Sequence, residues 1–126
     1  MVKAVVRTVC ALAMMAVGFL HFARPAPFVA IVPAALPAPE LLVYLSGAAE
    51  IAGGLGLLWS RTRVAAAWGL IALYLAVFPA NVNQAIHRIP FEPGAAPPSD
   101  AVLWGRLPFQ LVFIGLAYWF TRKDRR

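Results

Sequence analysis

The segment LLVYLSGAAEIAGGLGLLWS, residues 41–60, decides the fold of this chain, because its twenty residues include only one charged side chain, Glu50. A helix of about 20 apolar residues is long enough to cross the ~30 Å hydrocarbon core of a bilayer. No water satisfies the backbone there, so a helix is the expected conformation. The segment therefore predicts a membrane-spanning helix with an acidic group near its middle.

Three further blocks with few or no charges lie on either side of this segment, and basic residues bound them. Together the four blocks predict helices over residues 4–23, 41–60, 64–87 and 105–122. The composition agrees, because 62% of the chain is hydrophobic and 13% is charged, whereas soluble domains are roughly half apolar and about a quarter charged. We expect an all-α membrane protein: one transmembrane domain over residues 1–126, built as a four-transmembrane-helix bundle.

Basic residues are divided unevenly between the ends of these helices. Cytoplasmic loops of membrane proteins carry an excess of Lys and Arg, so we expect both termini in the cytoplasm and the two Pro-rich loops, residues 24–40 and 89–100, outside. His21 and Arg24 stand where a cleavable signal peptide would need small residues, which argues against cleavage. Eight of the eleven basic residues lie on the predicted inner side: Lys3, Arg7, Arg61, Arg63, Arg122, Lys123, Arg125 and Arg126.

Charge and cysteine content exclude several classes of function. The net charge of +6 is spread over helix ends rather than gathered in one patch, so we expect no nucleic-acid partner. The single cysteine, Cys10, rules out an internal disulfide and a CxxC pair; we expect it to behave as a small buried apolar residue. His21, His87 and Glu50 are acceptable metal ligands, but their spacing fits no metal motif, so we expect no metal site.

The polar residues inside the apolar blocks indicate a site. A carboxylate at the bilayer centre is costly, so Glu50 must be protonated, paired or turned to a wet cavity. Glycines around it, Gly47, Gly53 and Gly54 among them, favour close approach of another helix. The remaining polar residues gather toward the outer helix ends, which predicts an outward-facing polar pocket. Its candidate ligand-binding residues are His21, Glu50, Asn81, Gln84, His87, Arg106 and Gln110.

Several of these residues have a second interpretation. Glu50 could instead hydrogen-bond only to fix helix packing, and His87 could be solvated among the headgroups. Arg106 could pair with Glu50 or reach lipid phosphate. Asn83 and Gln84 are adjacent, so only one can face the interior of a helix bundle.

Prolines mark the loops and two helix positions. Residues 24–40 are expected to lie at the interface with at least one short helical turn, as a connector or a lid. Pro79 deprives the carbonyl of Leu75 of its donor and favours a kink in the third long helix. Ser99 or Asp100 is expected to cap a short helix leading to Arg106, with Pro108 in the first turn of the fourth long helix.

Five segments resemble the DoxX-like family of small membrane proteins: GFLHFARP (18–25), IVPAALPAP (31–39), YLSGAAEIAGGLGLL (44–58), FPANVNQAIH (78–87) and RLPFQ (106–110). The resemblance implies a four-helix bundle in the bacterial cytoplasmic (inner) membrane. It also implies a redox-associated role through a bound quinone or a partner subunit, because the family name derives from a subunit linked to thiosulfate:quinone oxidoreduction. The family's polar positions map onto His21, Glu50, Asn81, His87, Arg106 and Gln110.

Two functions follow as competing expectations. The first is binding of a quinone or another lipid-like molecule that enters laterally between helices, as a redox-associated accessory; quinone is then the candidate cofactor. The alternative is a membrane assembly or chaperone-type protein whose polar cluster is structural and whose partner is another membrane protein or a second copy of the chain. An ion or proton transporter is a third possibility. No soluble-enzyme motif is present, so the sequence leaves open whether the protein is an enzyme.

Overall fold

The computed structural model describes residues 1–92 and 94–123, and all of the regular structure in these ranges is helical. Its helices are α1 (Val2–Ala23), α2 (Pro25–Ala30), α3 (Pro39–Leu58), α4 (Arg63–His87) and α5 (Asp100–Thr121). The four longer ones, α1, α3, α4 and α5, are long and apolar enough to cross a membrane. This confirms the prediction of an all-helical chain with four such helices.

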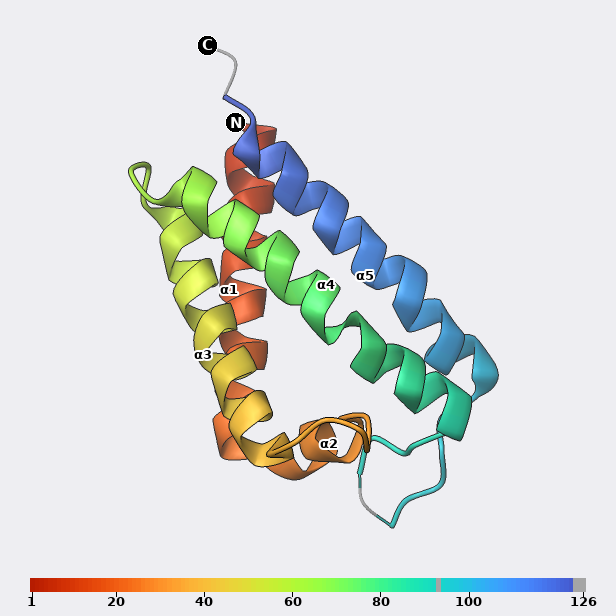
Figure 1. Ribbon diagram of the computed structural model, residues 1–126. Helices are drawn as coiled ribbons and strands as arrows, with labels where there is room; N and C mark the ends of the chain where they lie inside the picture. The colour runs from red at the N-terminus through yellow and green to blue at the C-terminus, as the bar shows by residue number, and fades with distance from the viewer. Residues whose placement is uncertain (93, 124–126) are drawn as a thin grey trace.

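The long helices form two pairs. α1 packs along α3 and α4 packs along α5, while contacts between α3 and α4 join the pairs. Figure 1 shows the pairs close together at the end that carries both termini and spread apart toward the other end, where α2 lies. The Nζ of Lys3 donates a hydrogen bond to the carbonyl oxygen of Arg122 over 2.7 Å, which links the first turn of α1 to the end of α5. The divergence leaves space between the pairs at the α2 end.

Small residues allow α1 and α3 to pack at backbone contact. A Cβ atom at Gly47 would lie 2.6 Å from the Cβ of His21 and 2.9 Å from the carbonyl oxygen of Gly18. A Cβ atom at Gly54 would lie 2.8 Å from the carbonyl oxygen of Ala11. Because no side chain larger than hydrogen fits these points, the glycines around Glu50 serve the close helix approach that the sequence predicted.

An apolar core fills the bundle between the termini and the cavity described below. It includes Cys10, which is buried as an apolar residue should be. Many of the other large apolar side chains point outward instead, among them Leu12, Leu45, Leu75 and Leu111. The buried core residues are Cys10, Ala11, Met14, Leu57, Ala67, Leu70 and Phe120.

The predicted cap at Ser99 is confirmed at the start of α5, but the helix that follows it differs from the prediction. Ser99 is the N-cap, and its Oγ accepts from the backbone N of Val102 over 3.4 Å. The expected short helix before Arg106 is wrong, because one continuous helix runs from Asp100 onward and Pro108 lies inside it rather than in its first turn. A proline within a long apolar helix is tolerated when neighbouring groups satisfy the freed carbonyl, so the strong cap upstream sets the helix start.

The Pro-rich loop between α1 and α3 contains the short helix that was expected. α2 has Pro25 in its first turn, where a missing N–H is harmless. The loop ends at Ala38, whose positive φ of 50° turns the chain into α3. α2 contacts both α1 and α3, so this loop is packed against the bundle.

Arginines at the α2 end are paired with acids. Arg24 lies 2.6 Å from a carboxylate oxygen of Glu92, and Arg88 pairs with Asp100. The first pair joins the end of α1 to the loop between α4 and α5, and the second joins the two ends of that loop. They also neutralise two of the three arginines that the sequence places at this end.

Candidate functional site

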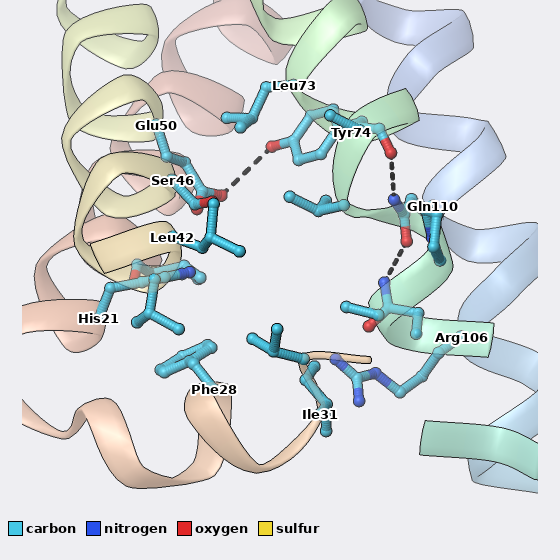
Figure 2. A pocket seen from close by; sticks show the side chains of 18 of the residues that line it. His21, Phe28, Ile31, Leu42, Ser46, Glu50, Leu73, Tyr74, Arg106 and Gln110 are labelled. Carbon is cyan, nitrogen blue, oxygen red and sulfur yellow. Dashed lines mark hydrogen bonds between the residues drawn. The ribbon is translucent and has the colours of Figure 1, made fainter. Parts of the chain in front are cut away.

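A cavity of about 420 Å³ occupies the space between the two helix pairs at their diverging end. Figure 2 shows α1 and α3 forming one wall, α4 and α5 the opposite wall, and Phe28 and Ile31 closing the α2 side. Most of the lining is apolar, with Met14, Val43 and Leu73 among the contributors. The polar lining residues are His21, Ser46, Glu50, Tyr74, Asn81, Arg106 and Gln110.

Glu50 projects from the middle of α3 into this cavity. Its side chain accepts a hydrogen bond from the Tyr74 hydroxyl, with 3.3 Å between that oxygen and Oε1, and only 8% of the residue is exposed. Ser46 lies one helical turn before it and lines the same wall. The bond spans the cavity from α3 to α4, as Figure 2 shows, so Glu50 has a neutral partner and a free side toward the cavity.

His21, in the last turn of α1, also lines the cavity. Its Nδ1–H donates to the carbonyl of Val17 over 2.8 Å, which leaves Nε2 as the atom free to accept or donate elsewhere. The imidazole stacks on Phe28 of α2, with ring centroids 3.9 Å apart. This stacking positions α2 against the open end of the bundle.

The opposite wall is held by amide side chains. Asn81 donates its Nδ2–H to Oε1 of Gln110, and Gln110 donates through Nε2 to the carbonyl of Tyr74 over 2.7 Å. Pro79 has no N–H, so it leaves the carbonyl of Leu75 without its helical donor. The sequence pointed to the carbonyl of Leu75, whereas the donor reaches its neighbour Tyr74. α4 and α5 are thereby locked together next to the cavity.

Arg106 extends from α5 into the cavity, and a hydrogen bond to Gln84 holds its guanidinium group. Its Nη1 donates to Oε1 of Gln84, a residue only 2% exposed, and Nε2 of Gln84 donates to the carbonyl of Ile89 over 3.1 Å. The guanidinium carbon lies 5.1 Å from the ring centroid of Phe91. Of the two interpretations of Arg106, pairing with Glu50 is not what the described contacts show; its side-chain partner is the neutral Gln84.

The adjacent residue Asn83 faces another direction. Its Nδ2 donates to the carbonyl of Ile31 over 3.0 Å and ties α4 to the loop after α2. This resolves the alternative for the adjacent pair, because Gln84 is the one that faces the interior.

Five of the seven candidate residues line the cavity: His21, Glu50, Asn81, Arg106 and Gln110. Gln84 lies behind the wall and supports Arg106. His87 lies outside the cavity, exposed, with its Nδ1 3.1 Å from the carbonyl of Asn83, so the solvated interpretation of His87 fits its position.

The sequence-based set did not include Tyr74, Ser46 and Phe28, which also line the cavity. Tyr74 is the partner of Glu50, and its signal was a hydroxyl in an otherwise apolar block of the third helix. Ser46 precedes Glu50 by one turn, a spacing that places both on one face. Phe28 carried no sequence signal, because only the tertiary fold brings α2 under the cavity.

The cavity is open to the outside between the helix pairs. Lining residues on both sides of the opening are exposed, including Ala13 and Val17 of α1, Ala76 of α4 and Phe109 of α5. In residues 1–92 and 94–123 no group of three or more His, Cys, Asp or Glu is placed to hold a metal ion. The arrangement suits a ligand that is largely apolar and carries a compact polar group.

A protein-family model, described as a domain of unknown function, matches residues 10–121, which include every residue that lines the cavity. The chain belongs to the DUF8561 family. No curated protein and no solved structure matches the chain. The DUF8561 description assigns no activity, so the function of this member is argued from its cavity, and the resemblance to the DoxX-like family stays a prediction.

Proposed function

We propose that this DUF8561 protein is a multi-pass protein of the bacterial cytoplasmic membrane, with four spanning helices and both termini in the cytoplasm. The support is the presence of four long apolar helices and the outward direction of many large apolar side chains. A water-soluble monomer rarely exposes so much contiguous apolar surface.

The charge distribution supports the orientation. Figure 1 shows both termini and the loop between α3 and α4 at one end of the bundle. The sequence gives Lys3, Arg61 and Lys123 to these segments, whereas Arg24 and Arg88 belong to the other end. Eight of the eleven basic residues of the sequence belong to the termini and to the loop between α3 and α4, and the count of Lys and Arg is the quantity that the positive-inside rule uses. By the positive-inside rule the cavity then opens in the outer half of the membrane.

We propose further that the cavity binds a lipid-like amphiphile, a quinone or an acyl lipid, and that the protein acts as a redox-associated accessory of the DoxX-like type. The observation that carries the binding proposal is the cavity itself. Its volume of about 420 Å³ falls in the range of roughly 300–1,000 Å³ typical of small-molecule sites. Apolar lining with a few convergent polar groups is the usual composition of such sites.

The polar groups of the cavity favour binding of a ligand headgroup over a purely structural role in helix packing. Glu50 and Arg106 face a cavity that is open to the apolar exterior, and each has only a neutral side-chain partner among the described residues. Ionisable groups in a membrane interior are costly unless they are paired or hydrated. A polar head in the cavity would supply those partners, while the opening between the helix pairs would admit the apolar tail from the bilayer.

Glu50→Ala is expected to lower the amount of co-purified quinone or lipid at least about tenfold, because a hydrogen bond to a charged group contributes about 1.5–3 kcal/mol. Glu50→Gln keeps the side-chain oxygen and is expected to retain more. Mass spectrometry of extracts, normalised to protein, makes the measurement, and thermal unfolding shows that each variant is folded. Equal retention by Glu50→Ala and the unsubstituted protein would remove Glu50 from the site.

Ala80→Phe is expected to abolish retention by filling the cavity, since Ala80 lines it on α4. Ala72→Phe is the matched control, because Ala72 lies on the same helix, is exposed and does not line the cavity. If both variants retain as much amphiphile as the unsubstituted protein, the bound molecules sit elsewhere. If the unsubstituted protein retains none, the polar cluster is structural, as the assembly-factor alternative expects.

A further inference from the structure

Two ionisable groups of opposite sign, Glu50 and Arg106, line the cavity, and neither has a charged partner among the described residues. Glu50 on α3 is hydrogen-bonded by the Tyr74 hydroxyl, and Arg106 on α5 donates to the Gln84 amide. The other arginines at this end differ, because Arg24 and Arg88 each bind a carboxylate. A partly buried charge with only neutral neighbours is costly. Arg106 is thus the arginine of this end that lacks a counter-charge among the described residues.

The two charged groups are held apart by their own supports. Gln84 and Phe91 fix the guanidinium on one side, and Tyr74 holds the carboxyl group on the other. Figure 2 shows Glu50 and Arg106 at opposite corners of the cavity, with the apolar space between them. Neither side chain has the other as a hydrogen-bond partner among the described contacts. The cavity therefore offers an acceptor at one corner and a fork of cationic donors at the other.

We propose that the cavity holds the headgroup of a phospholipid of the phosphoethanolamine class. The phosphate binds Arg106, whose fork of N–H donors suits a phosphate, and the primary ammonium binds Glu50. The acyl chains leave through the opening between the helix pairs, past Ala13 and Phe109, into the bilayer. This inference rests on the proposed function and selects the acyl-lipid class of ligand within it.

The charges and hydrogen-bond donors of a phosphoethanolamine headgroup match the cavity better than those of other headgroups. The two protein charges sum to zero, so a zwitterion of reversed polarity leaves both of them paired. A neutral quinone would leave both unpaired, and a purely anionic head would leave the carboxylate of Glu50 without a cation. A quaternary choline group carries the same charge as ethanolamine but has no N–H to donate to Glu50.

Lipid competition tests the headgroup. The protein is placed in nanodiscs of phosphatidylcholine that contain a small fraction of phosphatidylethanolamine or phosphatidylglycerol with the same acyl chains, and native mass spectrometry records the lipid retained. We expect phosphatidylethanolamine to be retained at least about tenfold over its share. Soluble phosphoethanolamine is added in a separate arm, and displacement of lipid at millimolar concentration would support the headgroup chemistry while pointing to a free phosphate ester as a second source.

Charge variants test the residues. Arg106→Gln is expected to reduce selective retention at least about tenfold, and Arg106→Lys to restore part of it because the charge remains without the fork. Arg24→Gln is the matched control, since it removes a positive charge at the same end from an exposed ion pair outside the cavity.

Two results would overturn the inference, and they differ from failure of the proposed function. Retention of phosphatidylethanolamine, phosphatidylcholine and phosphatidylglycerol in proportion to their shares would overturn the headgroup assignment while leaving amphiphile binding intact. Retention of no lipid and no quinone would overturn the proposed function as well. If Arg106→Gln does not fold, the selectivity of the unsubstituted protein still decides the question.

Discussion

Gly47→Leu is expected to destabilise the protein by about 3 kcal/mol, the upper part of the range for overpacked cores. The new Cβ would lie 2.6 Å from the Cβ of His21 and 2.9 Å from the carbonyl oxygen of Gly18. Neither neighbour can move without shifting the backbone of α1. The two helices would have to separate, and the wall that carries Glu50 and His21 would separate with them.

Gly115→Leu is the matched control for this substitution. Gly115 lies on α5, where nothing is within 4 Å of an added Cβ atom, so the same change in residue is expected to alter stability by less than about 1 kcal/mol. Thermal unfolding in one detergent, followed by circular dichroism, compares the two variants. Equal unfolding temperatures for Gly47→Leu and the unsubstituted protein would show that the α1–α3 contact is not close-packed in the membrane.

Cysteine labelling is expected to give an all-or-none contrast between the two ends of the bundle. In a Cys10→Ala background, a membrane-impermeant maleimide should label Ala95→Cys on intact cells and should label Ser60→Cys only after the membrane is permeabilised. Both positions are exposed. The physical reason is that segments rich in Lys and Arg resist transfer to the outer side, and eight of the eleven basic residues lie in the termini and in the loop between α3 and α4.

A reversed pattern would overturn the orientation but would leave the spanning helices intact. Labelling of both positions on intact cells would contradict membrane spanning itself. The Cys10→Ala protein without an added cysteine is the background control. Cys10 is buried in the apolar core, so its replacement by a smaller apolar residue is expected to be tolerated.

The elements of this fold were readable from the sequence to different degrees. The four long helices follow from apolar blocks of sufficient length with few charges, a property that depends only on local composition. The cap at Ser99 was predicted, but the continuity of α5 was not, because Pro108 suggested the first turn of a separate helix whereas α5 runs unbroken from Asp100. Two local signals competed there, and their relative strength depends on what satisfies the carbonyl freed by the proline.

The sequence identified those site residues whose type is unusual in their surroundings. Glu50 and Arg106 drew attention because ionisable groups inside apolar helices are costly. Tyr74 and Phe28 did not, because tyrosine and phenylalanine are ordinary in such helices and loops. The sequence also did not decide that Gln84 is buried while His87 is exposed, since this depends on how α4 is rotated against α5.

The amino-acid sequence by itself determined the helical class, the four apolar spans and the clustering of polar residues toward one set of helix ends, because hydropathy and charge act locally along the chain. The tertiary structure alone decided that the helices associate as two diverging pairs, that Tyr74 meets Glu50 and that Gln84 holds Arg106. These contacts join residues 24 and 22 positions apart, and they depend on how whole helices are placed against one another, which no local pattern encodes.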